Sequence, residues 1–215
     1  MKKTLYSLVL VSAILGGCSS SDVKKIEDKV NDTIDNYDGD QPREIIDNEE
    51  PVTLNEEMKN LIDIHNSARS DVGVTNKMRW SANIAKDAKI YADILARSGE
   101  FEHDPRNQKP QNGGGYANGT YGENLYSYRR SDGKVPTYSM AVEKWLSEKS
   151  LYDQEPITSE GADIYGHYTQ IVWSNTTKVG CARSQYKTGE FKDGYVVVCK
   201  YQTLGNYIGQ YPYPK

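Results

Sequence analysis

Residues 166–173 read Gly-His-Tyr-Thr-Gln-Ile-Val-Trp, a short run that contains one of only three histidines in the chain. The run is rich in β-branched and aromatic residues, which favour strands. The two-residue period of a strand would place four side chains on one face of a sheet, namely His167, Thr169, Ile171 and Trp173. An ionisable group on a packed face is costly unless it is paired, hydrogen-bonded or hydrated. His167 therefore requires either a structural partner or a functional site.

The pattern of the whole domain predicts three helices followed by antiparallel strands, the first of which is this run. The first helix starts at a capping box in residues 53–56, and the second runs from Ser81 to about Gly99. The third covers about residues 137–152. Strands are expected at 167–174, 178–186 and 194–202, whereas the glycine-rich stretch 105–136 is expected to be an irregular surface loop. The third helix would align four side chains on one face: Ala141, Trp145, Glu148 and Tyr152.

The N-terminal residues have the features of an export signal. Residues 1–17 include two lysines near the start and then an apolar run that is too short for a membrane span. Small residues precede Cys18 and resemble a bacterial lipobox, which implies cleavage before Cys18 and attachment of lipid to its sulfur. The membrane would then be a partner through acyl chains. An ordinary secretory signal is the alternative.

Charge separates a linker from one folded domain. Residues 18–52 contain eleven acidic and four basic residues and few aromatics, which predicts a lipid-anchored acidic linker that does not fold by itself. The domain at residues 53–215 is long enough for one core and is nearly neutral. It shows no basic patch, so no nucleic-acid partner is expected.

The remaining two cysteines are expected to form a disulfide. With Cys18 used for lipid, Cys181 and Cys199 are an even pair in a chain exported to a compartment that tolerates disulfides. Their midpoint is Glu190, so a hairpin folded there would bring the two sulfurs together across neighbouring strands. A turn centred at residues 193–194 would break that register, and two buried thiols are the alternative.

Four stretches of the chain, in this order, resemble a known pattern: His-Asn-Ser-Ala-Arg at 65–69, Gly-Glu-Asn-Leu at 122–125, the run at 166–173, and Val-Cys-Lys-Tyr at 198–201 leading to Gly-Asn-Tyr at 205–207. They resemble the CAP superfamily (cysteine-rich secretory proteins, antigen 5 and plant pathogenesis-related proteins of the first group), also called the SCP domain. The resemblance implies an α+β fold, a three-layer α-β-α sandwich with a small, largely antiparallel central sheet. Lys200 departs from the family pattern, in which a neutral polar residue is usual.

The resemblance also implies a central cleft lined by His103, Glu123, Glu148 and His167. Neutral imidazole nitrogens and carboxylate oxygens are ligands that Zn²⁺ accepts in open sites, so the four residues are predicted to hold a divalent cation. Zn²⁺ is preferred, with Mg²⁺ and Ca²⁺ as alternatives. A hydrogen-bonded polar cluster with a purely structural role is the other interpretation. His65 is interpreted as a helix-packing histidine and not as a ligand.

These features predict an exported protein, anchored by lipid to the bacterial cell envelope or surface, that acts as a binding module. The resemblance implies a sterol, a fatty acid or a protein partner as the ligand. The alternative is a metal-dependent, peptidase-like hydrolase in which Glu123 or Glu148 is the general base and His103 or His167 assists. The chain contains neither His-Glu-x-x-His nor Gly-x-Ser-x-Gly, which weighs against the hydrolase. An adhesin with a vestigial cleft is a third hypothesis.

Overall fold

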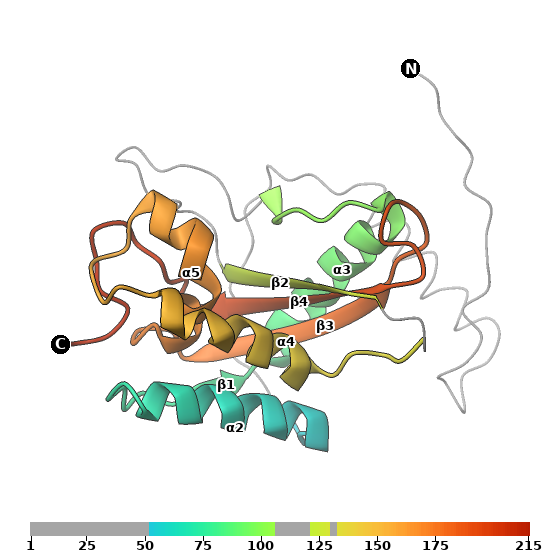
Figure 1. Cartoon of the computed structure of the whole chain (residues 1–215). Helices are drawn as coiled ribbons and strands as arrows, with labels where there is room; N and C mark the ends of the chain where they lie inside the picture. Colours follow the sequence, from blue (N-terminus) through green and yellow to red (C-terminus); the bar gives the residue numbers. More distant parts are fainter. Residues whose placement is uncertain (1–51, 106–120, 130–132) are drawn as a thin grey trace. The chain divides into compact units, whose positions relative to one another are not determined.

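The computed structural model describes residues 52–105, 121–129 and 133–215 (Figure 1). The predicted signal at 1–17, nearly all of the linker at 18–52 and the lipidation residue Cys18 lie outside the described residues. Within the part of the chain that is described, no helix is long and apolar enough to cross a membrane.

A four-stranded sheet forms the centre of the domain, in the order β1-β3-β4-β2. Strands β3 (Lys178–Gln185) and β4 (Tyr195–Gln202) form an antiparallel hairpin, and β2 (Gly122–Tyr128) pairs antiparallel with the other side of β4. The short β1 (Arg79–Trp80) lies parallel to β3. The sheet is therefore small and largely antiparallel, as predicted.

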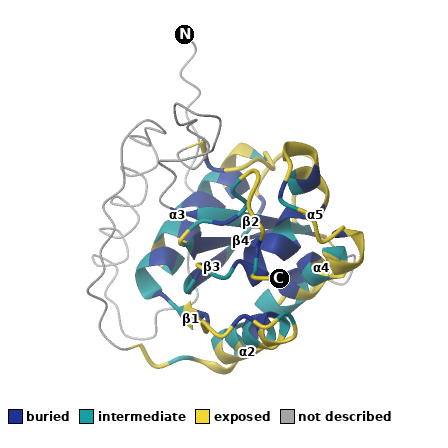
Figure 2. Cartoon of the chain, turned by 90° about the vertical axis from the view of Figure 1, so that its left-hand side faces the viewer, coloured by how far each residue is buried: buried dark blue, intermediate teal, exposed yellow. Residues whose placement is uncertain are grey.

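Strand β4 shows why the sheet must be covered on both faces. Its consecutive residues Val196, Val197 and Val198 are all fully buried, although neighbouring side chains of a strand point to opposite faces. Both faces must then be packed against other elements, which requires a layer of helix on each side. The burial view shows this buried centre, with exposed residues confined to the periphery (Figure 2).

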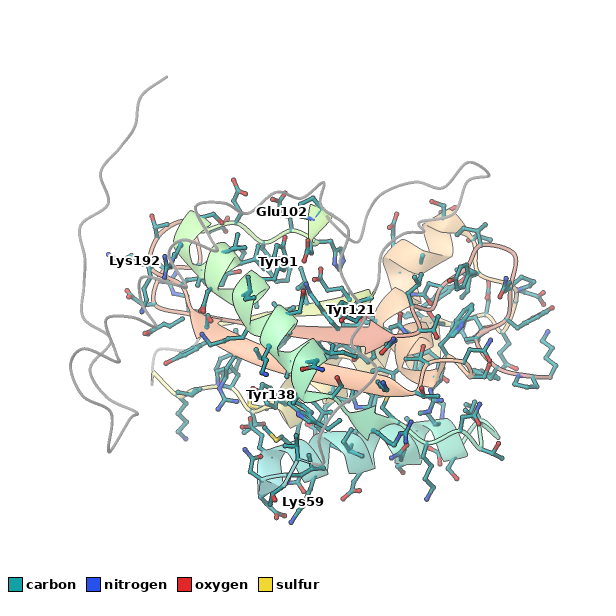
Figure 3. The ribbon with its side chains drawn as sticks, turned by 180° about the vertical axis from the view of Figure 1, so that it is seen from behind. Lys59, Tyr91, Glu102, Tyr121, Tyr138 and Lys192 are labelled. Atoms are coloured by element: carbon teal, nitrogen blue, oxygen red, sulfur yellow. A yellow bond between two sulfur atoms is a disulfide. The ribbon has the colours of Figure 1, made fainter. Side chains whose placement is uncertain are left out.

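One layer is α3 (Ala82–Ser98), which crosses the sheet in the view from behind (Figure 3). The helix starts where the sequence predicts, because the Ser81 side chain accepts a hydrogen bond from the backbone N–H of Ile84, 3.1 Å away. It ends at Gly99, whose φ of +80° suits glycine. Gly180 of β3 lets α3 approach closely, since an added Cβ there would lie 2.2 Å from the backbone N of Ala85.

The helices α2 (Glu56–Ser70), α4 (Tyr138–Leu146) and α5 (Ser159–Val172) pack together on the other face. The predicted third helix is shorter than expected, because α4 ends at Leu146 and continues as a 3-10 helix, η2 (Ser147–Leu151). The predicted capping box at 53–56 is also displaced, since Asn55 is the residue that caps α2. The result is the predicted α-β-α sandwich.

The strand predicted at 167–174 is wrong, because residues 166–172 form the second half of α5. Residues 168–172 are all buried, so the run is surrounded on every side and its apolar pattern cannot distinguish a strand from a helix. Strand propensity is a weak preference that packing overrides. His167 and Thr169 consequently do not share a face.

Strand β2 lies within the stretch predicted to be irregular. Its sequence Gly-Glu-Asn-Leu-Tyr-Ser-Tyr contains strand-forming residues, but the glycines at 113–115 and 119 dominated the pattern of the whole stretch. Residues 106–120, which contain those glycines, lie outside the described part of the chain.

The predicted disulfide is present between Cys181 and Cys199, whose Cα atoms lie 4.1 Å apart. The two residues are direct partners in the β3–β4 register, so the hairpin is centred on Glu190 as expected. The alternative turn centred at residues 193–194 is excluded, and so is the pair of buried thiols.

Candidate functional site

The four residues predicted to line a cleft are arranged as two histidine–glutamate pairs. In the first pair, Nδ1 of His103 lies 2.8 Å from Oε1 of Glu123. His103 follows α3, and Glu123 is the second residue of β2. The same Oε1 accepts a hydrogen bond from the backbone N–H of Asp104 at 3.0 Å. A carboxylate accepts only, so the His103 ring donates from Nδ1.

The chain segment that carries His103 is fixed to α3. The hydroxyl group of Tyr91 donates a hydrogen bond to the carbonyl oxygen of Glu102 at 2.9 Å, and both residues are labelled in Figure 3. Burial disfavours the charged imidazole of His103, but its hydrogen bond to Glu123 and the negative charges of Glu123 and Asp104 outweigh burial and raise its pKa above the usual range.

The carboxylate of Glu123 lies beside a buried ammonium group. Glu123 and Lys200 are register partners on β2 and β4, so their side chains share one face of the sheet. Nζ of Lys200 lies 3.8 Å from Oε2 of Glu123 and 2.5 Å from one oxygen each of Asp87 and Asp104. The side chain of Lys200 is fully buried and that of Glu123 is 2% exposed, so these charges interact with little screening by water.

In the second pair, Nδ1 of His167 lies 2.7 Å from Oε1 of Glu148. Oε2 of Glu148 accepts hydrogen bonds from the backbone N–H groups of His167 and Tyr168, at 3.1 and 3.2 Å. Tyr165 interrupts α5 with non-helical angles (φ −131°, ψ 17°), so a new helical segment starts at Gly166. The first N–H groups of a helix have no partner within it, and Glu148 caps two of them.

The ring of His167 is also held by Trp145. The two rings are stacked, with centroids 6.0 Å apart and planes 13° apart. The indole N–H of Trp145 donates to the carbonyl oxygen of Leu125 on β2 at 3.0 Å, which anchors the tryptophan to the sheet. A hydrogen bond at one ring edge and stacking on one ring face together set the orientation of His167.

A series of buried hydrogen bonds connects the second histidine–glutamate pair to the interior of the domain. The side-chain amide of Asn124 donates to the carbonyl oxygen of His167 at 3.1 Å and to the Tyr201 hydroxyl at 3.4 Å. Tyr201 lies 3.1 Å from Nε2 of His65, and Nδ1 of His65 lies 2.8 Å from the carbonyl oxygen of Leu61. Because Asn124 follows Glu123 directly, strand β2 contacts both histidine–glutamate pairs.

His65 has the structural role predicted for it. It is fully buried, and burial lowers its pKa to about 4, an effect that the nearby charge of Arg69 reinforces and the hydrogen bond to Leu61 opposes. A neutral ring that donates from Nδ1 and accepts at Nε2 satisfies both of its nitrogens.

The contacts within the two histidine–glutamate pairs limit which of their atoms could bind a metal ion. Among the residues that the structure describes, no group of three or more His, Cys, Asp or Glu side chains is placed to hold a metal ion. Glu123 and Glu148 instead direct oxygens at Nδ1 of the two imidazoles and at backbone N–H groups. Joint coordination by all four residues stays a prediction.

The sequence did not identify two contributors to the site. Lys200 appeared only as a departure from the family pattern, and Asn124 only as part of a motif. The approach of Lys200 to Glu123 and the contacts of Asn124 depend on β2 pairing with β4 and lying beside α5, and β2 was not predicted. The alternation of residues 122–128 along a strand could have placed Glu123 and Asn124 on opposite faces.

Comparisons with known proteins agree on one family for this chain. The family model described as the cysteine-rich secretory protein (CAP) family matches residues 62–201. The chain is 39% identical over 155 residues to pathogenesis-related protein 1A of Nicotiana tabacum, an alignment that covers 72% of this chain and 80% of that protein. It is 32% identical over 163 residues to pathogenesis-related protein 1 of Arabidopsis thaliana, covering 76% and 86% of the two proteins.

Among solved structures, the crystal structure of NaASP2 with Zn²⁺ superimposes with a TM-score of 0.56 and 23% sequence identity, covering 75% of this chain and 87% of that one. This likeness concerns the fold alone. The family match spans well over half of the chain, and the plant relatives are aligned over most of their length. The chain therefore belongs to the CAP, or cysteine-rich secretory protein, family.

Proposed function

We propose that this protein is an exported binding module that takes up a divalent cation, with Zn²⁺ as the first choice, through Nε2 of His103 and Nε2 of His167. The observation that carries the proposal is that Nδ1 of each ring lies within 2.8 Å of a glutamate oxygen. A neutral imidazole that donates from Nδ1 has its lone pair on Nε2, the form that a metal ion requires. Glu123 and Glu148 then orient the two rings and fix the tautomer with the proton on Nδ1.

Zn²⁺ is the first cation to test for two reasons. Imidazole nitrogen is a preferred ligand of Zn²⁺, whereas Ca²⁺ and Mg²⁺ prefer sets of oxygens. In addition, the related fold of NaASP2 has been solved with Zn²⁺. A bound cation would supply a positive charge that recruits an anionic or polarised group of a ligand.

The test is equilibrium binding of Zn²⁺ to the metal-free protein. Binding is measured by calorimetry, and the bound metal is quantified by metal analysis after dialysis. The double variant His103→Gln/His167→Gln should lose binding, and Glu148→Gln should weaken it about 10- to 100-fold, as expected when the residue that orients a metal ligand is changed. Glu143→Gln is the matched control, because Glu143 is exposed on α4. Unchanged affinity in the double variant would refute the proposal.

The hydrolase alternative is less well supported by the contacts of the glutamates. Oε1 of Glu123 faces two donors, and the two oxygens of Glu148 face three. A general base must lie within hydrogen-bond reach of the proton that it removes, and these oxygens are already directed at groups of the protein itself. Turnover of a peptide or ester library by the Zn²⁺-loaded protein, lost in Glu148→Gln, would favour the hydrolase.

The proposal also includes the exported, lipid-anchored state and an apolar ligand. Export agrees with membership of a family described as secretory. The lipobox-like residues before Cys18 support a bacterial lipoprotein, and Cys18→Ala should move the protein from the membrane fraction to the soluble fraction. Native mass spectrometry of protein purified from its own envelope would report a copurifying sterol or fatty acid together with the cation.

A further inference from the structure

The chain that follows β4 is tied to both ends of helix α5 (Figure 1). Ile157, which precedes the helix, exchanges two backbone hydrogen bonds with residues 209–210, at 2.8 and 2.9 Å. Ser174, which follows the helix, donates from its backbone N–H to the carbonyl oxygen of Pro212 at 2.7 Å. The segment 205–212 is therefore held along the helix that carries one of the two histidine–glutamate pairs.

The side chain of Asn206 connects this segment to the middle of α5. Its Nδ2 donates to the carbonyl oxygen of Gly166 at 2.8 Å, and its Oδ1 lies 2.7 Å from the Thr169 hydroxyl group, the shortest contact of that hydroxyl group with an acceptor. A carbonyl oxygen only accepts, so the amide must turn its NH₂ group towards Gly166. The backbone of Asn206 has a φ of +59°, in the left-handed region that asparagine adopts more readily than most residues.

Asn206 and Glu148 bind opposite ends of one peptide group. The carbonyl group of Gly166 and the backbone N–H group of His167 belong to the same planar peptide unit. Asn206 donates to the oxygen of this unit, and Oε2 of Glu148 accepts from its nitrogen at 3.1 Å. A hydrogen bond to the carbonyl oxygen polarises the peptide and strengthens its N–H group as a donor. The hydrogen bond to Glu148 therefore depends on Asn206.

The orientation of this peptide is passed on to the imidazole ring. Oε1 of the same Glu148 carboxylate accepts from Nδ1 of His167 at 2.7 Å. The two oxygens of a carboxylate are rigidly linked, so the peptide that positions Oε2 also positions Oε1. The non-helical angles of Tyr165 interrupt the helix just before this peptide, so contacts with other elements are needed to set its direction.

We propose that Asn206 is a positioning residue for the His167–Glu148 pair and acts through the peptide group between Gly166 and His167. The value of this role for ligand binding rests on the proposed function, whereas the positioning itself is a property of the metal-free protein. The His103–Glu123 pair is the internal reference, because His103 follows α3 and Glu123 lies on β2, away from this peptide group in the chain.

The experiment uses the purified protein with Asn206→Asp and with Asn206→Gly. The first substitution keeps the size of the side chain and an oxygen for Thr169, but it places an acceptor in front of the Gly166 carbonyl group. The second tolerates a positive φ and removes both contacts. Asn66→Asp is the matched control: Asn66 is also half-buried, and it donates to the carbonyl oxygen of Met78 at 3.1 Å and accepts from its N–H group at 2.7 Å.

Two measurements on the metal-free protein report the position of the pair, and thermal unfolding reports whether each variant is folded. Nitrogen NMR detects the protonated, hydrogen-bonded Nδ1 of His167, and hydrogen exchange follows the backbone N–H groups of His167 and Tyr168. In both Asn206 variants the Nδ1 signature should weaken and the exchange should become at least about tenfold faster, as expected when a hydrogen bond to a charged group is lost. The His103 ring should stay unchanged, and Asn66→Asp should alter neither reading for His167.

Two results would overturn the inference. An unchanged His167 ring in the folded Asn206 variants would show that Asn206 does not position the pair. Equal changes at His103, or the same change at His167 in Asn66→Asp, would show a general loosening of the domain instead. Failure of the proposed function is seen separately in Zn²⁺ titrations, as no binding to the wild-type protein or as binding that survives in His103→Gln/His167→Gln.

Discussion

Acidification should destabilise this domain through His65, by far more than the protonation of a surface histidine would. His65 is fully buried, and its pKa is lowered from 6.5 to about 4. An imidazolium at this position would donate from both nitrogens, so Tyr201 could no longer donate its hydroxyl proton to Nε2. The same hydroxyl already accepts a hydrogen bond from Asn124, so the buried hydrogen bonds that join His65, Tyr201 and Asn124 would be disturbed.

The sign and size follow from proton linkage. The unfolded chain protonates His65 near pH 6.5, whereas the folded protein resists protonation until about pH 4. The unfolded state therefore binds more protons between these values, and stability falls as the pH decreases through this window. Each unit of pKa difference corresponds to about 1.4 kcal/mol, so the loss from His65 is about 3 kcal/mol by pH 4.

The assay is urea unfolding at intervals from pH 7.5 to pH 4, for the wild-type protein and for His65→Gln. The variant will be less stable at neutral pH, but its free energy of unfolding should vary about 3 kcal/mol less across the window. His103 titrates in the opposite sense, because its raised pKa stabilises the folded state on acidification. It is present in both proteins, so the difference isolates His65. Parallel pH profiles for the two proteins would refute the reasoning.

Three further predictions concern packing and cross-links. Gly180→Ala should destabilise the domain by about 3 kcal/mol in urea unfolding, because the added Cβ would meet the backbone of α3 at 2.2 Å. Reduction of the Cys181–Cys199 disulfide, which closes a loop with a sequence separation of 18, should cost about 3 kcal/mol, measured by unfolding with and without a reductant. Arg69→Lys should lower the free energy of unfolding by at least about 3 kcal/mol, seen as a lower melting temperature. The planar guanidinium donates to carbonyl oxygens including those of Asn76, Trp173 and Thr176, and an ammonium cannot replace it.

Local chemistry was sufficient for the parts of the fold that depend on neighbours in the chain. Helix α3 was predicted from the capping Ser81 to the terminal Gly99, since both signals lie within a few residues of the backbone groups that they satisfy. The β3–β4 hairpin and its disulfide were predicted because the register of a hairpin follows from the midpoint between its strands. The family followed from short motifs, and it named the four residues of the candidate site.

Only the tertiary structure decided the state of residues 166–172 and the partners of the site residues. A run buried on every side has no exposed face to reveal its period, so the packing around α5 determined that it is a helix. The pairing of His103 with Glu123 and of His167 with Glu148 joins residues 20 and 19 positions apart on different elements. The ammonium of Lys200 reaches Glu123 only because β2 lies beside β4. Such contacts depend on distances in space, which the order of residues along a chain does not contain.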